Sequence, residues 1–241
     1  MLTPLRQGLF PWLAPYRQTV VAPTLRTERR LLRQGFQLVA CADEVGRGAL
    51  AGPVTVGMVL VSAQTPPAPV GVQDSKLLTA QRRAALAPRI RQWAPHAVGH
   101  ASSTEIDDLG IMVAMRLAAL RAFAELQALG PAADLILLDG NQDYLTGKEQ
   151  PSLFEADLFP PVALPEVRTQ VKADVSCAGV AAASILAKVN RDALMIRYAE
   201  EYPDYGWAAN KGYAAPEHLA ALTRLGPTRL HRMSWQLPTR A

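Results

Sequence analysis

Two β-type runs close together in the first quarter of the chain constrain its fold more than any other feature of the sequence. Residues 36–42 (FQLVACA) and 53–62 (PVTVGMVLVS) are rich in the apolar and β-branched residues that favour strands. The segment EVGRGALAG that joins them is rich in glycine, which is typical of a turn or bulge. We therefore expect the two strands to pair with each other and to begin a β-sheet.

After this pair, strand-like runs alternate with helical segments. Further strands are predicted at residues 96–101, 134–139 and 167–173, and the second is nearly all apolar, as in a strand covered on both faces. Helices are predicted at residues 79–93, at 111–129 after a capping box of Ser102 and Glu105, at 175–201 and at 216–225. Pro88 is expected to kink or shorten the first helix. The pattern predicts an α/β fold with a mixed β-sheet flanked by helices.

Composition and charge narrow the class of protein. With 241 residues, 49% of them apolar and 19% charged, the chain can bury one sizeable core. Its formal charge of +4 is too small for binding to nucleic acid by charge alone. The charge is uneven, because residues 1–35 carry +5, residues 205–241 carry +4 and the middle carries −5. We expect one domain at residues 36–241 and a basic N-terminal extension at residues 1–35.

Neither export nor a membrane is indicated by the sequence. Prolines interrupt the apolar residues near the N-terminus, and no run approaches the roughly 18 unbroken apolar residues of a membrane helix. Cys41 and Cys177 lack metal-ligand spacing and are expected to be buried free thiols. The expected location is cytoplasmic.

Four carboxylates stand where predicted strands or helices end. Asp43 and Glu44 follow the first strand, Asp139 ends the strand at 134–139, and Asp174 lies between a strand and a helix. Strand ends are where α/β sheets bind ligands, so these side chains can converge. Turn formation and helix capping also explain single aspartates at such positions, and for Asp174 taken alone capping is the favoured interpretation.

A cluster of like charges is costly unless a cation neutralises it. Oxygen donors without His or Cys suit hard ions such as Mg²⁺ or Mn²⁺. Four carboxylates could hold two such ions about 4 Å apart, an arrangement that supports phosphodiester cleavage. The sequence suggests no Ser-His-Asp or Cys-His arrangement and no P-loop or dinucleotide-binding motif that would compete with this hypothesis.

The residues around these carboxylates resemble a known family. The stretch DEVGRGALAGPV at 43–54 is similar to the signature of bacterial ribonuclease HII. Further motifs in the same order extend the resemblance over about residues 36–235: DSK at 74–76, STEID at 103–107, LLDGN at 137–141, KADVSCAGVAAASILAKVNRD at 172–192, YGWAANKGYAAPEHLAAL at 205–222 and GPTRLHRMSW at 226–235.

The resemblance implies an RNase H-like catalytic domain at residues 36–241, including a C-terminal helical region. It implies a metal-dependent endoribonuclease that hydrolyses the RNA strand of RNA/DNA hybrids and cuts 5′ to ribonucleotides embedded in duplex DNA, leaving 3′-hydroxyl and 5′-phosphate ends. Asp43, Glu44, Asp139 and Asp174 match the family's four carboxylates, which hold two Mg²⁺ or Mn²⁺ ions in the catalytic complex. The partners would be RNA/DNA hybrids and DNA duplexes containing ribonucleotides, bound by a monomer without a membrane.

Two further motifs match residues with which the family recognises the ribose. Gly46, Arg47 and Gly48 match its GRG loop, which reads the 2′-hydroxyl largely through the backbone. Glycine permits positive φ and close approach of the main chain to the sugar. Tyr213 matches a tyrosine that stacks near the ribonucleotide and bonds the 2′-hydroxyl, the group that distinguishes RNA from DNA. Outside this resemblance, a bulged turn and a packed tyrosine are the simpler interpretations.

The helix after Asp174 carries a polar face. Ser184, Lys188 and Arg191 follow at positions i, i+4 and i+7, which by itself is typical of a solvated face. In the resembling family this helix lies against the substrate backbone, so Ser184 and Lys188 are candidate phosphate contacts, as is Lys76, with Arg191 a further candidate. Phosphate contacts carry little sequence information, so specificity for the sugar and the helix shape is expected.

The sequence departs from the family pattern in places outside the four carboxylates. Residues 142–166 form a longer connection than in the compact members of the family. DSKLL stands where DSKKL is familiar and HRMSW where HRRSF is common, so a phosphate contact could be lost at each.

Three rival functions are weighed against this one. Ribonuclease HIII normally has a separate N-terminal domain and a GKG-type loop, whereas 35 residues are too few for that domain and Arg47 favours HII. A non-catalytic nucleic-acid-binding protein on the same fold would lack a metal carboxylate, and all four are present. A Mg²⁺-dependent phosphatase for small phosphoesters would not explain the GRG loop or the basic helix face.

Overall fold

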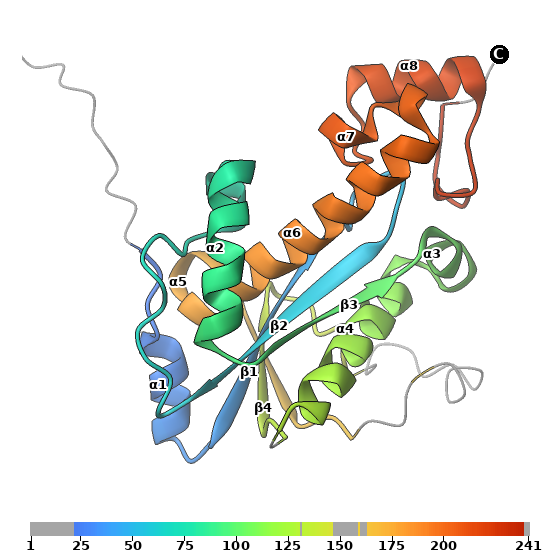
Figure 1. Ribbon diagram of the computed structural model, residues 1–241. Helices are drawn as coiled ribbons and strands as arrows, with labels where there is room; N and C mark the ends of the chain where they lie inside the picture. Colours follow the sequence, from blue (N-terminus) through green and yellow to red (C-terminus); the bar gives the residue numbers. More distant parts are fainter. Residues whose placement is uncertain (1–21, 131, 147–158, 160–162, 239–241) are drawn as a thin grey trace, which may run out of the picture.

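A five-stranded mixed sheet forms the centre of the computed structural model, which describes residues 22–130, 132–146, 159 and 163–238 (Figure 1). The strands are β1 (Leu38–Val45), β2 (Val54–Ser62), β3 (His96–Ala101), β4 (Leu135–Asp139) and β5 (Glu166–Gln170). Their order across the sheet is β3-β2-β1-β4-β5. The first three pair antiparallel, while β4 and β5 run parallel to β1. The predicted mixed sheet and its local β1–β2 pair are confirmed.

Helices cover both faces of this sheet (Figure 1). They are α1 (Arg26–Arg33), α2 (Ala80–Trp93), α3 (Ser103–Leu109), α4 (Ile111–Ala128), α5 (Ala173–Ser176), α6 (Ala178–Glu201), α7 (Trp207–Asn210) and α8 (Pro216–Leu225), with short 3₁₀ helices η1 (Ser75–Leu77) and η2 (Pro203–Tyr205). The helix α4 packs on β2 and β3, and α6 packs on β1 and β2. The C-terminal helices α7 and α8 gather at the far end of α6, which gives the predicted C-terminal helical region.

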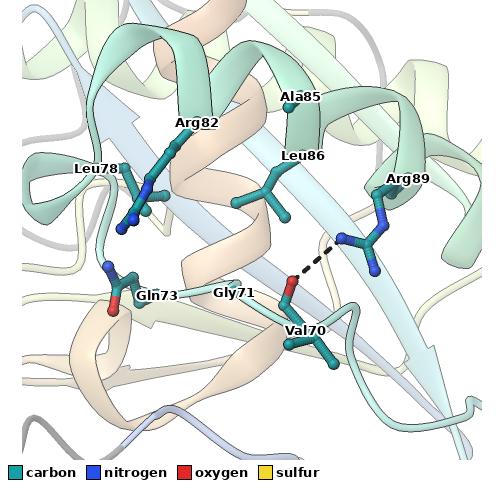
Figure 2. A pocket seen from close by; sticks show the side chains of 8 residues that line it. All are labelled: Val70, Gly71, Gln73, Leu78, Arg82, Ala85, Leu86 and Arg89. Atoms are coloured by element: carbon teal, nitrogen blue, oxygen red, sulfur yellow. Dashed lines mark hydrogen bonds between the residues drawn. The ribbon is translucent and has the colours of Figure 1, made fainter.

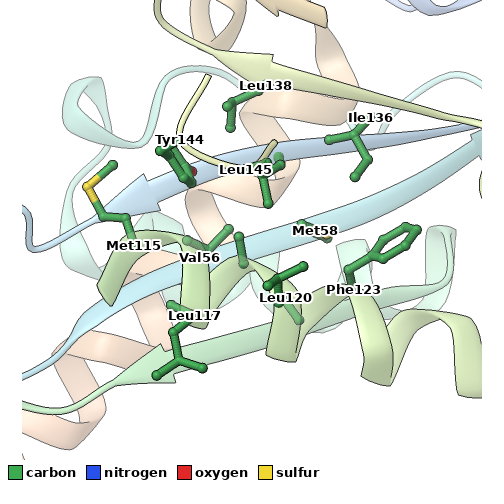
Figure 3. Packing of buried hydrophobic residues seen from close by; sticks show 14 of the residues in the cluster. Val56, Met58, Met115, Leu117, Leu120, Phe123, Ile136, Leu138, Tyr144 and Leu145 are labelled. Atoms are coloured by element: carbon green, nitrogen blue, oxygen red, sulfur yellow. The ribbon is translucent and has the colours of Figure 1, made fainter. Parts of the chain in front are cut away.

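Strand β1 is buried on both faces because its side chains alternate between the two helical layers. Ala40 and Ala42 belong to the core that α4 covers, whereas Val39 and Cys41 belong to the core that includes the start of α6. Figure 3 shows side chains of α4, β2 and β4 together in the first of these cores, on the sheet face that α4 covers. A slip of one residue would exchange the two faces, so packing fixes the register that brings Asp43 to the end of the strand.

Local signals in the sequence place most elements correctly, with four differences. Strand β1, predicted to end at residue 42, continues to Val45, so Asp43 and Glu44 lie within the strand near its end and do not follow it. The capping box is confirmed, since Ser102 N donates to Glu105 Oε2 at 2.8 Å and Glu105 N to Ser102 Oγ at 3.2 Å. The expected shortening at Pro88 is wrong, because α2 continues to Trp93. The helix predicted at 175–201 is divided into α5 and α6 by Cys177, whose backbone is extended, and β5 ends at Gln170 rather than residue 173.

The basic helix α1 lies within the predicted N-terminal extension and packs on the sheet. Leu31 is buried, and the fully buried Glu28 accepts a hydrogen bond of 2.8 Å from the Gly179 amide at the start of α6. The division of the chain at residue 35 stays a prediction. Much of the predicted surface loop at 142–166 lies outside the described residues.

Two other predictions concern burial and membranes. Both cysteines, Cys41 and Cys177, are buried and free, as predicted. Among the residues that the structure describes, no helix is long and apolar enough to cross a membrane.

Candidate active site

The predicted carboxylates meet at one end of the sheet. Strands β1 and β4 are parallel neighbours in which Ala42 lies opposite Leu138. The next residues along each strand, Asp43 and Asp139, therefore lie level with each other, with Asp139 as the last residue of β4 and Asp43 two residues before the end of β1. Glu44 follows Asp43 on β1. Residues 96 positions apart in the sequence are thus brought together by the sheet register.

Asp139 also brings the fourth carboxylate to this place. Its Oδ1 accepts hydrogen bonds from the amides of Ala173 at 2.7 Å and Asp174 at 3.3 Å, the first residues of α5. The helix cap is Lys172, which makes no side-chain cap, so the capping interpretation of Asp174 is wrong. Asp139 instead satisfies the free amides at the helix start. The carboxylate of Asp174 remains available next to it.

The electrostatics of the four side chains reflect this crowding. Burial raises the pKa of Asp43 to about 8; a hydrogen bond from Ser184 opposes this shift, and the charges of Glu44, Asp139 and Asp174 add to it. Burial also raises the pKa of Glu44, an effect that Arg47 opposes and Asp139 reinforces. The pKa of Asp174 is raised by burial and by Asp139. Like charges in a buried site disfavour ionisation, so the cluster suits a bound cation.

The chemistry of the donors fits a hard divalent metal ion. All four side chains offer oxygen, and Tyr144 adds a buried hydroxyl that has no hydrogen-bond partner among the described residues. Burial raises the pKa of that hydroxyl, and the charges of Glu44, Asp43 and Asp139 raise it further, so it lies in the field of the cluster. Oxygen donors are those that Mg²⁺ and Mn²⁺ prefer.

The side chains are not arranged around a single point in this structure. In the described part of the chain, no three His, Cys, Asp or Glu side chains are grouped closely enough to hold an ion as they stand. One oxygen of Asp139 is engaged by the α5 amides, and Lys76 Nζ lies 3.6 Å from Asp174 Oδ2. The ligand role of the four carboxylates stays a prediction, supported by their shared location and charge.

The GRG segment, residues 46–48, follows Asp43 and Glu44 in the chain after one residue. Gly46 has a φ of +87°, and a Cβ there would lie 2.1 Å from Arg191 Nε, so both backbone and space require glycine. The Arg47 side chain turns aside, with Nη2 donating to Gln142 Oε1 at 3.0 Å. Gly48 has open space around its Cα. The main chain of the loop is therefore accessible next to Glu44.

Tyr213 lies beside this loop although 165 or more residues separate them in the sequence. The Gly212 carbonyl accepts hydrogen bonds from the Leu50 amide at 2.8 Å and the Ala51 amide at 3.2 Å. The half-buried Tyr213 ring lies 5.7 Å from Lys188 Nζ and 5.3 Å from the Arg191 guanidinium carbon. The structure thus places the two predicted ribose-reading motifs together.

The predicted polar face of α6 divides into three different environments. Ser184 is buried, shares a 2.8 Å hydrogen bond with Ser75, and also bonds Asp43. Lys188 is paired with Asp192 at 2.7 Å. Arg191 is fully buried, so its prediction as a phosphate contact is wrong: its guanidinium is enclosed between the GRG segment and Gly212 and bonds carbonyl groups. Periodicity alone cannot separate an exposed polar face from one that is buried and satisfied.

Sequence reasoning missed two functional contributors. Arg232 appeared only as part of the HRMSW motif, yet it is fully buried and bonds the GRG carbonyls. Ser75, in the centre of DSK, supports Ser184 beneath Asp43. Their position within short motifs was the only available signal, because burial is a property of the folded chain.

Comparisons with known proteins identify the family of this chain. Residues 40–238 match the family model of ribonuclease HII. The chain belongs to the ribonuclease HII family. A ribonuclease HII from Streptomyces avermitilis is 46% identical over 216 residues, covering 88% of this chain and 84% of that protein. This membership confirms the predicted ribonuclease H enzyme.

Two solved ribonuclease structures have a similar fold. The ribonuclease H2 from Pyrococcus horikoshii superposes with a TM-score of 0.64 at 25% identity, covering 84% of this chain and 95% of that one. Bst-RNase HIII, solved in complex with Mn²⁺, has a TM-score of 0.64 at 22% identity and covers 84% of this chain and 68% of its own. The predicted RNase H-like fold of this ribonuclease HII family member is confirmed.

Proposed function

We propose that this chain is a metal-dependent endoribonuclease that hydrolyses the RNA strand of RNA/DNA hybrids and cuts 5′ to ribonucleotides embedded in duplex DNA. The products carry 3′-hydroxyl and 5′-phosphate ends, and the enzyme acts as a monomer. One observation carries the proposal: the GRG loop follows Asp43 and Glu44 after one residue, and the amides of Leu50 and Ala51 just beyond it bond Gly212, the residue before Tyr213. A carboxylate cluster and a ribose-reading surface are thereby adjacent.

Asp43, Glu44, Asp139 and Asp174 would hold two Mg²⁺ or Mn²⁺ ions. Such ions supply an activated water and stabilise the charge on the leaving oxygen of a phosphodiester. The protein contributes the placement of the ligands: Ser184 holds Asp43, and the α5 amides hold Asp139. Mn²⁺ is present in the complex of Bst-RNase HIII, whose fold this chain shares, which supports an ion of this class.

Recognition of the ribose is assigned to Gly46, Arg47, Gly48 and Tyr213. The loop would bind the ribose through its main-chain groups, because the Arg47 side chain donates a hydrogen bond to Gln142. The Tyr213 hydroxyl supplies a second polar group that can bond the 2′-hydroxyl, by which proteins distinguish RNA from DNA. Specificity for the sugar rather than for a base sequence follows.

Lys76, Ser184 and Lys188 are assigned to the phosphate backbone near the cut. Lys76 is the most accessible, with 77% of its side chain exposed, and it lies beside Asp174. Lys188 is half-buried between Asp192 and the Tyr213 ring. Ser184 is buried, so any phosphate that it contacts must reach the floor of the site beside Asp43. Contacts of this kind set affinity and position.

The rival functions explain less of the site. A ribonuclease HIII would lack the arginine of GRG, and the family match is to ribonuclease HII. A phosphatase acting on small esters needs neither the GRG loop nor Tyr213. A non-catalytic binding protein would bind hybrids without cutting them, which the following assay separates directly.

The decisive test is cleavage of a DNA duplex that contains one ribonucleotide, with Mg²⁺ or Mn²⁺ varied and the product ends analysed. A single cut 5′ to the ribonucleotide that leaves 3′-hydroxyl and 5′-phosphate ends is expected. An all-DNA duplex and a continuous hybrid serve as controls. Binding without a cut at any metal concentration would favour the non-catalytic rival, and ends of the opposite polarity would contradict the proposed chemistry.

A further inference from the structure

Two arginines, Arg191 and Arg232, are fully buried next to the GRG loop. One comes from α6 and the other from the segment after α8. Within the described residues, neither forms an ion pair with a carboxylate. A buried charge without a counter-ion is costly unless other groups solvate it, so both must have another role.

Arg232 is solvated by the carbonyl groups of the GRG loop itself. Its Nη2 donates to the Gly46 carbonyl at 2.6 Å and its Nη1 to the Arg47 carbonyl at 2.7 Å. The Nε and Nη2 atoms donate to the Gly52 carbonyl at 3.2 and 3.1 Å. One guanidinium therefore binds carbonyl groups at both ends of the segment 46–52, which contains the GRG loop.

Arg191 binds carbonyl groups at the end of this segment and also one in the turn before Tyr213. Its Nε donates to the Pro53 carbonyl at 2.8 Å and its Nη2 to the Ala51 carbonyl at 3.0 Å. Its Nη1 donates to the Lys211 carbonyl at 2.9 Å, two residues before Tyr213. The Tyr213 ring lies over the same guanidinium.

These contacts fix the direction in which the loop presents its amides. A trans peptide points its N–H opposite to its carbonyl, and the described chain contains no cis peptide. Because the carbonyls of Gly46 and Arg47 point at Arg232, the amides of Arg47 and Gly48 point away from it. Neither amide has a hydrogen-bond partner in the described part of the chain. Consecutive free amides of this kind can bind an oxygen atom of a ligand.

We propose that Arg191 and Arg232 are positioning residues for recognition of the ribose. They bind the loop carbonyls, so that the amides of Arg47 and Gly48 face the 2′-oxygen of the ribonucleotide, and they keep Tyr213 in a fixed position relative to these amides. The proposal rests on the proposed function, in which this loop reads the ribose. Both side chains are fully buried, so neither can contact the substrate itself. Their effect on specificity passes through the loop.

Both guanidiniums keep their charge at neutral pH. Burial and the nearby charge of Arg191 lower the pKa of Arg232 to about 9, and burial lowers the pKa of Arg191. Charged donors make stronger hydrogen bonds than neutral ones. Lysine keeps the charge but lacks the planar group that reaches three carbonyls, so it is not an equivalent replacement.

The test compares R191K and R232K, and R191M and R232M, with the exposed controls R197M and R229M. The readout is the ratio of kcat/KM on a duplex with one ribonucleotide to kcat/KM on the same duplex with a 2′-fluoro nucleotide there. Fluorine is a poor acceptor, and the ratio does not depend on the fraction of folded enzyme. We expect the ratio to fall by about 10-fold or more in all four buried-site variants, because small misplacements are costly. The two controls should keep the wild-type ratio.

Hydrogen exchange gives a second readout that needs no substrate. The amides of Leu50, Ala51 and Gly52 are bonded to Gly212 and Leu230 and should exchange faster in the four variants but not in the controls. If a methionine variant does not fold, its lysine counterpart decides. A wild-type ratio in the lysine variants would overturn the proposal. If the wild-type enzyme does not distinguish the two sugars, the proposed ribose reading fails, and unchanged amide exchange would then separately refute the positioning role.

Discussion

At the scale of a single residue, the carboxylate of Asp43 lowers the stability of the fold because it is buried among like charges. It is 5% exposed and is surrounded by the charges of Glu44, Asp139 and Asp174. Only the hydrogen bond from Ser184 favours its charged form among the causes of its pKa shift. A carboxylate in this place destabilises the metal-free fold, and its retention is explained by the ion that it would bind.

Asp43→Asn should abolish cleavage in the presence of Mg²⁺ or Mn²⁺, and it should raise the stability of the metal-free fold. The ordinary pKa of this carboxyl is 3.8 and the folded value is about 8, so between them the folded protein holds a proton that the unfolded chain has lost. Stability due to this group therefore falls as pH rises from about 4 to 8. We expect the variant to be more stable by several kcal/mol at pH 8, because each pKa unit corresponds to about 1.4 kcal/mol. Thermal unfolding in EDTA at pH 5 and pH 8 measures this.

The matched control is Asp74→Asn, which changes an aspartate near the site that is not a predicted ligand. It should retain turnover. Undiminished cleavage by Asp43→Asn with Mg²⁺ or Mn²⁺ would contradict the metal assignment, and equal stability of variant and wild type at pH 8 would contradict the account of charge crowding.

Tyr213 provides a second prediction at this scale. Tyr213→Ala should lower kcat/KM on a duplex with a single ribonucleotide by about 10-fold or more, and should affect a continuous hybrid less. The lost contacts are worth about 1–3 kcal/mol for stacking on one base. Tyr213→Phe keeps the ring over Arg191 and should lie between wild type and alanine. Equal losses on both substrates would show that Tyr213 does not read the junction.

At the scale of elements, a buried cluster of rings connects η2, α7, α8 and the segment that carries Arg232. Trp207 Nε1 donates to His218 Nε2 at 3.0 Å, and His231 Nε2 lies 3.1 Å from the same atom. His218 Nδ1 lies 2.8 Å from the Tyr213 carbonyl, and the Thr228 amide donates to His231 Nδ1. Each contact pairs a donor with an acceptor when both histidines are neutral, with protons on His218 Nδ1 and His231 Nε2; the single lone pair of His218 Nε2 is then shared by two donors.

Acid should therefore loosen this C-terminal cluster. Burial and the proximity of His218 lower the pKa of His231 from 6.5 to about 4. The unfolded chain takes up this proton first, so the stability is fully present above pH 6.5 and is lost as pH falls towards 4. We expect a loss on the order of 1–3 kcal/mol across this window. His231→Gln should reduce the slope, while His96→Gln on β3 should leave it unchanged; thermal unfolding from pH 4 to 7 is the measurement.

Local patterns were sufficient for most elements and insufficient for the contacts between them. The capping box at Ser102 depends on two residues three positions apart, and it was predicted correctly. Arg191 and Ser184 share the helical spacing of a solvated face, but their burial depends on what covers α6. Sequence spacing describes an isolated helix, whereas the GRG segment and η1 pack on that helix only in the folded chain.

At the scale of the whole molecule, two surface cavities in the described part of the chain are lined by none of the four carboxylates. Figure 2 shows one of about 450 Å³ between α2 and the segment before η1, lined by Val70, Gly71, Gln73, Leu78, Arg82, Ala85, Leu86 and Arg89. Arg89 closes one side by donating to the Val70 carbonyl at 3.2 Å. The predicted catalytic residues lie instead at one end of the interior strands β1 and β4 and at the start of α5.

Charge distribution over the molecule predicts the salt dependence of binding. The chain carries +4 overall, with −5 in residues 36–204, where the four carboxylates lie. Two divalent ions would bring that region to about −1 and leave the basic ends in excess. Affinity for duplexes should fall steeply between about 50 and 200 mM salt. Fluorescence anisotropy with an all-DNA duplex measures the slope, and an affinity independent of salt would contradict phosphate binding.

The sequence by itself determined the residue types, the local elements and the family motifs. Strand and helix patterns, the glycines of the loop and the identity of the four carboxylates all depend on neighbours within a few positions. The tertiary structure alone decided which distant residues meet: the β1–β4 register brings Asp43 to Asp139, and Arg232 holds a loop 185 positions earlier in the chain. The reason is physical, because burial and hydrogen bonding between distant segments arise only when the whole core packs.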